Sequence, residues 1–244
     1  MKKMIFSFRK VTLIAAAVVV MGGLLVACKK DDAVGTPIPA AGLMVFNLAP
    51  DQDAVGFALS GNIINNTPLS YTSYNGFYQN IYTGSREIEV FGFMDSVFAS
   101  SSFNFENNTQ YSLFLTGNNG KYQAITVEDA LDSNATADKA WVRYINAIPD
   151  SSAPQVKISA GGTSVVDESA AFNLVTPFTP VDGGDVTISV NNSDDIAAGR
   201  TIQLSNGKAY TVLLVGVPGA TDETKKVQIR FIENGTIPSA VTDK

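Results

Sequence analysis

The sequence predicts an all-β protein with two tandem immunoglobulin-like antiparallel β-sandwich domains, which follow a lipoprotein signal peptide. Three observations predict this organisation. The chain opens with a basic and then apolar segment that ends in its single cysteine. Beyond residue 43 it consists of short segments in which apolar and polar residues alternate, as in half-buried strands. The order of these segments then returns at a spacing of about one hundred residues.

The first 27 residues have the layout of a secretory signal. Four basic residues, Lys2, Lys3, Arg9 and Lys10, precede an apolar stretch over 11–26. The alternative is a transmembrane helix, which needs about 20 apolar residues. Glycines interrupt this stretch at 22–23 and charged residues follow it directly at 29–32, so we expect a signal peptide over 1–27.

The end of this segment, Leu25-Val26-Ala27-Cys28, resembles the lipobox of bacterial lipoproteins. The resemblance implies that signal peptidase recognises Leu25, Val26 and Ala27 and cuts before Cys28, whose sulfur carries a diacylglyceryl group and whose amino group is acylated, for example by palmitate. The alternative is an ordinary buried cysteine behind a signal. Several acyl chains give stable anchoring, so we expect outer-membrane lipid to be a partner through Cys28.

The residues after Cys28 bear on sorting. Position two of the mature chain is Lys29, whereas an aspartate there resembles an inner-membrane retention signal, so we expect the outer membrane. The run Lys29-Lys30-Asp31-Asp32 resembles a tag for export to the cell surface. An ordinary solvated linker is the alternative, which would leave the protein on the periplasmic face.

Composition excludes several classes of function. The signal holds four of the 17 basic residues and none of the 23 acidic ones, which leaves 13 bases against 23 acids and a formal net charge of −10. Nucleic acid is a poor partner for such a chain. The sequence has no histidine and one cysteine, which excludes Ser-His-Asp and Cys-His catalysis and zinc sites of these residues. We therefore expect neither an enzyme nor a cofactor.

We expect the lipidated cysteine and an extended, proline-containing tether over 28–42. A first sandwich follows over 43–131, in which Val55, Phe57 and Leu59 alternate with small residues and the turn at 117–120 separates two strands. A polar linker over 132–139 leads to a second sandwich over 140–238 and a tail over 239–244. One buried face per sheet is expected.

The internal repeat supports the division into two domains. Residues 45–51 (VFNLAPD) match 144–150 (YINAIPD), and 111–117 (YSLFLTG) match 210–216 (YTVLLVG). Tyr111 and Tyr210 each open an apolar strand, where we expect a buried ring whose hydroxyl bonds to backbone.

The second repeat carries the run 143–149 (RYINAIP), a stretch over 178–184 and the run 207–216 (GKAYTVLLVG). This pattern resembles the domain-of-unknown-function family 4397, whose members are secreted or lipid-anchored bacterial β-domains, often in tandem. The first repeat lacks the arginine at the corresponding position. The resemblance implies the fold and the setting, and it brings no catalytic residues.

One stretch departs from the repeat and holds the candidate ligand-binding residues Tyr71, Tyr74, Tyr78 and Tyr82, together with Asn and Gln. Exposed aromatic residues of this kind favour a glycan or protein partner. In the alternative interpretation Tyr78 and Phe178 fill the same core position and the other tyrosines decorate an edge strand. The repeat predicts 171–182 as the counterpart of 71–82.

Two weaker signals remain. Acidic pairs at Asp51/Asp53, Asp182/Asp185 and Asp194/Asp195 lack the spacing of a known calcium loop and are expected to be solvated turns. The triplet Asp95-Ser96-Val97 resembles a bacterial O-glycosylation sequon, which would modify Ser96.

The sequence thus predicts a membrane-anchored, non-enzymatic envelope lipoprotein with a binding or adhesive surface. One alternative is a structural spacer or subunit of a surface complex. The other is a glycosidase that uses two carboxylates.

Overall fold

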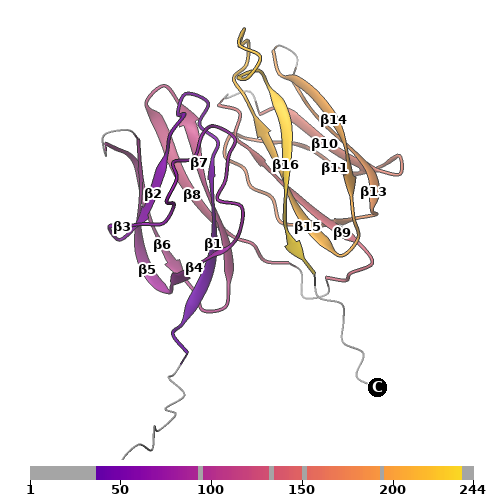
Figure 1. Ribbon diagram of the computed structural model, residues 1–244. Coiled ribbons are helices and arrows are strands. Elements are labelled where there is room, and N and C mark those ends of the chain that lie inside the picture. Colours follow the sequence, from indigo (N-terminus) through magenta and orange to yellow (C-terminus); the bar gives the residue numbers. More distant parts are fainter. Residues whose placement is uncertain (1–36, 93–95, 132–134, 150–152, 193–194, 238–244) are drawn as a thin grey trace, which may run out of the picture. The chain divides into compact units, whose positions relative to one another are not determined.

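The structure is a computed structural model, and it describes residues 37–92, 96–131, 135–149, 153–192 and 195–237 (Figure 1). Residues from Pro39 onward form one compact unit, which contains sixteen strands and no helix within the described ranges. Those ranges accordingly hold no helix of the length and apolarity that would cross a membrane. The all-β prediction is confirmed. The signal peptide and Cys28 lie outside the described residues, so both remain predictions.

The first eight strands form two four-stranded sheets, in the orders β4-β1-β7-β8 and β3-β2-β5-β6. Their bounds are β1 Ala40–Asn47, β2 Gly56–Leu59, β3 Asn62–Ile63, β4 Gln79–Tyr82, β5 Gly84–Phe91, β6 Val97–Phe105, β7 Gln110–Asn118 and β8 Lys121–Glu128. Figure 1 shows them in indigo to magenta.

The next eight strands repeat this arrangement, in the orders β12-β9-β15-β16 and β11-β10-β13-β14. Their bounds are β9 Ala140–Asn146, β10 Gln155–Ala160, β11 Thr163–Ser169, β12 Thr179–Val181, β13 Gly184–Asn191, β14 Ala197–Leu204, β15 Lys208–Val215 and β16 Gln228–Thr236. Each strand occupies the place of the strand eight earlier, so two tandem sandwich-like domains of one topology are present. Whether they are immunoglobulin-like in detail stays a prediction.

One strand pair in each sandwich departs from the antiparallel expectation. β1 runs parallel to β7, with Val45 opposite Leu113, and β9 runs parallel to β15, with Tyr144 opposite Val212. The other pairs are antiparallel. A parallel pair needs a long connection, and here the intervening strands of the same sandwich supply it.

Each sandwich has its own core, made by alternate residues of its two sheets. Val55, Phe57, Ile88 and Val90 are fully buried in the first core, as their alternation predicts. The hydroxyl of Tyr111 accepts a hydrogen bond from the backbone N–H of Glu106 (3.1 Å), and that of Tyr210 accepts one from Ser205 (3.1 Å). The expected role of these two tyrosines is confirmed.

The expectation of one buried face per sheet is wrong for the sheets that contain β1 and β9. β7 is buried from Tyr111 to Gly117, and β9 is buried along its whole length. The residues that face away from each sandwich core meet in a third apolar cluster, which draws on both domains. Strands that are buried on both faces appear as continuous apolar runs rather than alternating ones.

An asparagine ends the first strand of each domain in the same way. The amide of Asn47 donates to the carbonyl of Leu69 (3.0 Å) and its oxygen accepts from the N–H of Ala49 (3.1 Å). Asn146 makes the same contacts with Ala170 (2.8 Å) and Ile148 (3.1 Å). Both asparagines are fully buried, so their amides supply the backbone with partners where the ladder stops.

Candidate functional site

Two places in the molecule concentrate polar side chains in an uncommon way. The first is a buried cluster that joins the two sandwiches, here called the Arg143 cluster, and its members are Tyr78, Ser112, Asp129, Arg143, Thr211 and Asn234. The second is an open groove on the first sandwich, here called the 64–79 groove, which is lined by Ile64, Asn65, Asn66, Thr67, Leu69, Tyr74, Asn75, Phe77 and Gln79.

The Arg143 cluster is built on an ion pair that is withdrawn from water. Nη2 of Arg143 lies 2.7 Å from Oδ1 of Asp129, and both side chains are 2% exposed. The guanidinium also donates to Ser112 Oγ (2.9 Å) and to Thr211 Oγ1 (2.9 Å). Its carbon lies 4.5 Å from the ring centroid of Phe178, within the range of a cation–π contact.

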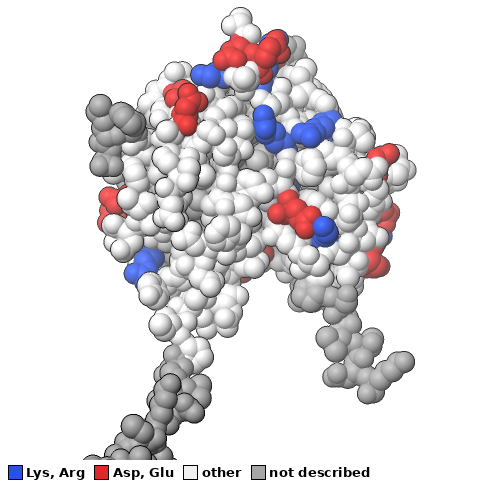
Figure 2. Space-filling view, viewed as in Figure 1, with Lys and Arg blue, Asp and Glu red and all other residues white. Residues whose placement is uncertain are grey.

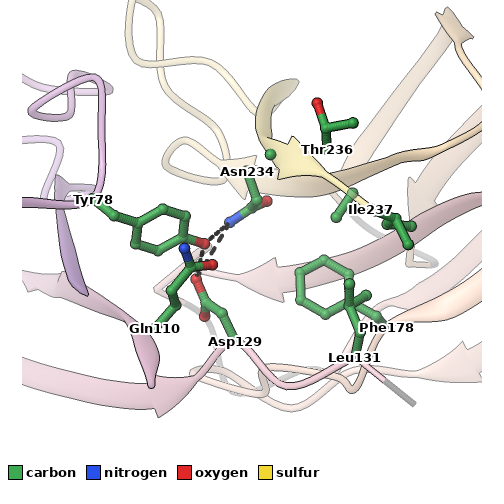
Figure 3. A pocket seen from close by; sticks show the side chains of 10 residues that line it. Tyr78, Gln110, Asp129, Leu131, Phe178, Asn234, Thr236 and Ile237 are labelled. Atoms are coloured by element: carbon green, nitrogen blue, oxygen red, sulfur yellow. Dashed lines mark hydrogen bonds between the residues drawn. The ribbon is translucent and has the colours of Figure 1, made fainter. Parts of the chain in front are cut away.

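The remaining oxygen of Asp129 collects the other donors of the cluster. Ser112 donates to Oδ2 at 2.7 Å. The Tyr78 hydroxyl donates to the same atom, and the Asn234 amide lies 3.4 Å from it (Figure 3). Burial, and then the charge and hydrogen bond of Asp129, raise the pKa of Tyr78 above its usual value. Tyr78 is therefore held protonated as a donor.

The cluster is formed by equivalent positions of the two repeats that carry different residues. Met44 and Arg143 each lie opposite the second residue of the apolar strand, Ser112 and Thr211. Asp129 follows Glu128, the partner of Tyr111, and Asn234 follows Glu233, the partner of Tyr210. Arg143 is equivalent to Met44 and Asp129 is equivalent to Asn234, so each charged residue has an uncharged counterpart in the other repeat.

Beside the cluster lies a cavity of about 40 Å³, which Tyr78, Asp129 and Asn234 line together with apolar residues such as Phe178 and Ile237 (Figure 3). A volume of this size accommodates water-sized molecules and excludes an organic ligand. The side chains of Tyr78, Asp129 and Asn234 already bind one another. We therefore assign the Arg143 cluster a structural role, which is to fix how the two sandwiches pack.

The 64–79 groove has a different character, because it is open and has a volume of about 550 Å³. One wall is held by Asn65, whose oxygen accepts from the N–H of Phe57 (2.6 Å) and whose amide donates to the carbonyls of Val55 (3.0 Å) and Thr67 (2.9 Å). The other is held by Asn75, whose oxygen accepts from the N–H of Val45 (3.1 Å). Side-chain amides thus fix one wall beside β2 and the other to β1.

A one-residue insertion shapes the groove, and the predicted correspondence of 71–82 with 171–182 is therefore wrong by one residue before the insertion. The N–H of Tyr144 donates to Thr176, and the N–H of Val45 donates to Asn75. Asn75 and Thr176 are therefore equivalent, and they are 101 positions apart in the sequence. Gln79 pairs with Leu43, and Thr179 pairs with Val142. Gln79 and Thr179 are therefore equivalent, and they are 100 positions apart. The extra residue lies at 76–77, where Gly76 has a φ of +88° and the Phe77 side chain is 62% exposed. Glycine adopts this conformation without strain.

The structure places the four candidate tyrosines in different surroundings. Tyr74 lines the groove, but its ring stacks on Phe46 with centroids 5.4 Å apart. Tyr71 and Tyr78 are largely buried against the third apolar cluster. Tyr82 is 64% exposed and lies three residues beyond the groove residue Gln79.

The alternative interpretation of Tyr78 is confirmed in one respect. Tyr78 and Phe178 precede the equivalent residues Gln79 and Thr179, and both side chains reach the Arg143 cluster. The exposed aromatic ring that lines the groove is Phe77, which the tyrosine pattern missed. The feature that distinguishes Phe77 is the change in spacing between equivalent residues of the two repeats, which falls from 101 at Asn75 to 100 at Gln79.

The weaker sequence signals acquire local contacts. Asp51 accepts from the N–H of Asn119 (2.8 Å) and from the Tyr122 hydroxyl (2.6 Å), and Asp182 pairs with Lys139 (2.5 Å). No group of three or more His, Cys, Asp or Glu is placed to hold a metal within the described ranges. Ser96 is exposed beside β6, while Asp95 and Asp194 lie outside the described residues.

The ion pair gives a prediction about stability. Asp129→Asn and Arg143→Met each leave one buried charge without its partner, which should lower the free energy of unfolding by about 3–5 kcal/mol. The double variant places at each position the residue type of the other repeat, Asn234 and Met44. Because no charge remains unpaired, we expect it to lose much less than the sum of the single variants. Urea unfolding of the four proteins measures the coupling, and strictly additive losses would contradict it.

Tyr71 gives a prediction about pH. Burial raises its pKa to about 12, although the charge of Arg230 opposes the shift. Its hydroxyl lies near the backbone of Gly216 without a hydrogen bond of normal geometry. The native state therefore keeps a proton that the unfolded state releases near pH 10, so this stabilisation is complete below pH 10 and is lost as the pH rises through about 12.

Tyr71→Phe should accordingly flatten the fall of unfolding free energy over this pH range by up to about 1.4 kcal/mol per pH unit. Urea unfolding at a series of alkaline pH values measures it. Tyr82→Phe is the control, because that side chain is 64% exposed and its variant should follow the wild type. Parallel curves for the wild type and Tyr71→Phe would rule the prediction out.

Comparison with known proteins agrees with the repeated fold. No curated protein matches the chain. The family described as "Domain of unknown function (DUF4397)" matches residues 41–153 and again residues 140–240, which together span both sandwiches. The resemblance seen in the second repeat is thereby confirmed for the first as well. The chain belongs to the DUF4397 family.

Proposed function

We propose that this chain is a non-enzymatic cell-envelope lipoprotein, held at the outer membrane by acyl chains on Cys28, whose 64–79 groove binds a glycan or protein ligand. The observation that carries the binding role is the groove itself. It is open, its walls are fixed by Asn65 and Asn75, and it presents an exposed aromatic ring at Phe77. Exposed aromatic residues beside a concave surface favour a binding site.

The position of the insertion supports the same role. Core positions agree closely between the two repeats, from the capping asparagines to the tyrosines that open β7 and β15. The first repeat departs from the second where Gly76 and Phe77 replace a single Pro177. An exposed phenylalanine on an added residue contributes nothing to the core, so a role outside the fold accounts for it better.

The residue types support the non-enzymatic part of the proposal. The chain has no histidine, and its one cysteine is the predicted lipid attachment site. The buried serine and aspartate of the Arg143 cluster are occupied with one another and with Arg143, which leaves no free nucleophile in the cluster.

A second candidate, a structural spacer or subunit of a surface complex, is favoured by the Arg143 cluster. A buried ion pair between two domains fixes their packing, as a rigid spacer requires. This candidate needs no ligand in the 64–79 groove, so variants of the groove distinguish the two roles.

The binding role is tested with the full lipidated chain in detergent micelles, applied to immobilised neutral polysaccharides, acidic polysaccharides, glycoproteins and unglycosylated envelope proteins. We expect at least one class to be retained and Phe77→Ala to weaken its binding about tenfold or more. Tyr82→Ala, an aromatic of equal exposure outside the groove, is the matched control. Retention that does not depend on Phe77, or no retention at all, would favour the spacer.

The anchor is tested separately with Cys28→Ala. The wild type should incorporate labelled palmitate and partition with membranes, whereas Cys28→Ala should carry no label and leave the membrane fraction, because no other acylation site is expected. Ser96→Ala serves as a control that retains the cysteine. Unchanged labelling in Cys28→Ala would refute the anchor.

A further inference from the structure

We infer that the ligand of the 64–79 groove is a neutral sugar chain, whose pyranose ring packs on Phe77 while its hydroxyl groups bond to the amides of Asn66 and Gln79. This inference rests on the proposed binding function and specifies its ligand class. Three properties of the groove favour this ligand: its lack of charge, its free side-chain amides and its exposed phenylalanine ring.

The charge of the groove indicates a neutral ligand. The residues that line it include no lysine, arginine, aspartate or glutamate. Phosphates, sulfates and carboxylates are recognised by positively charged donors, and a cationic ligand needs carboxylates. In Figure 2, the central part of the surface over the first sandwich, whose strands are indigo to magenta in Figure 1, is largely free of charged side chains. An uncharged ligand therefore fits this surface better than an acidic polymer or a basic peptide.

The hydrogen-bonding groups of the groove match hydroxyl groups. Asn66 is exposed and Gln79 is partly exposed, and neither side-chain amide has an intramolecular partner in the described part of the chain. Each amide offers both donors and an acceptor. A sugar hydroxyl also donates and accepts, so one amide can bond to two neighbouring hydroxyls.

The walls that carry these two amides are already rigid. Asn65 precedes Asn66 and is fixed by its hydrogen bonds to Phe57, Val55 and Thr67. Gln79 lies in β4, where it pairs with Leu43. Side chains held on fixed backbone lose less entropy when they bind.

Phe77 supplies the apolar part of the site. Its ring is 62% exposed and carries no hydroxyl, so it offers a flat apolar surface. The face of a pyranose ring presents several C–H groups, which pack against such a surface with a gain in buried apolar area. An extended peptide is the competing occupant, because it adds to a sheet edge through backbone hydrogen bonds and β4 is an edge strand. A peptide added to β4 leaves the free side-chain amides of Asn66 and Gln79 without a specific partner, whereas sugar hydroxyls bond to both, which favours the sugar.

The test is titration calorimetry of the full chain in detergent with three probes. These are a neutral hexose oligosaccharide, a uronic acid oligosaccharide of equal length and an unglycosylated peptide of similar length. We expect binding of the neutral oligosaccharide, with an affinity that does not change between low and high salt.

Variants locate the binding. Phe77→Ala should weaken it about tenfold or more and Phe77→Trp should preserve it, because tryptophan retains a flat ring. Asn66→Ala and Gln79→Ala should each weaken it about threefold to tenfold, the usual effect of one lost hydrogen bond. Tyr82→Ala should bind like the wild type, and an equal loss in Tyr82→Ala would overturn the assignment to the groove.

The remaining outcomes separate this inference from the proposed function. Phe77-dependent binding of the peptide or of the acidic oligosaccharide alone overturns the inference and leaves the groove as a binding site. If none of the three probes binds, the neutral sugar is rejected. The proposed function fails only if the wider panel of polysaccharides and proteins also shows no retention that depends on Phe77.

Discussion

The packing of the two sandwiches depends on one ion pair that water does not reach. Two side chains that are each 2% exposed would be strongly unfavourable alone, and they are compatible with the fold because each satisfies the other. The remaining polar atoms of the pair bond to the side chains of Ser112, Thr211, Tyr78 and Asn234. Apolar packing alone would allow several ways to join two similar faces, whereas this pair has one set of partners.

Both places of interest arise where the repeat is broken. The scaffold uses one topology twice, down to the asparagine that ends the first strand and the tyrosine that opens the seventh. Met44 against Arg143, and Asp129 against Asn234, turn a symmetric interface into an ion pair. One added residue near Phe77 shapes the 64–79 groove in the first domain. The two repeats thus share one scaffold, and small sequence differences between them give rise to the Arg143 cluster and the 64–79 groove.

The sequence was sufficient for the fold class and the repeat because both leave local patterns. Alternation at 55–59 and 88–90 marks half-buried strands, and these residues lie in the first core. The continuous apolar run at 111–117 is typical of a strand buried on both faces, whereas the alternation of the other segments predicts one buried face. No local pattern predicted the pairing of Arg143 with Asp129, because that contact joins the two domains. The insertion at 76–77 is hard to recognise in the sequence, because a uniform spacing of 100 between the two repeats aligns this stretch almost correctly.

The parallel pairing of β1 with β7 has a mechanical consequence. β1 is the first strand of the compact unit, and it lies between β4 and β7. The hydrogen bonds from β1 to β4 are perpendicular to the strand, and those to β7 are evenly spaced and slanted. A pull on the chain ahead of β1, directed along the strand, therefore loads these bonds together in shear instead of peeling them one after another. If the chain is tethered to a membrane at that end and held by a ligand elsewhere, β1 resists the tension with its whole length.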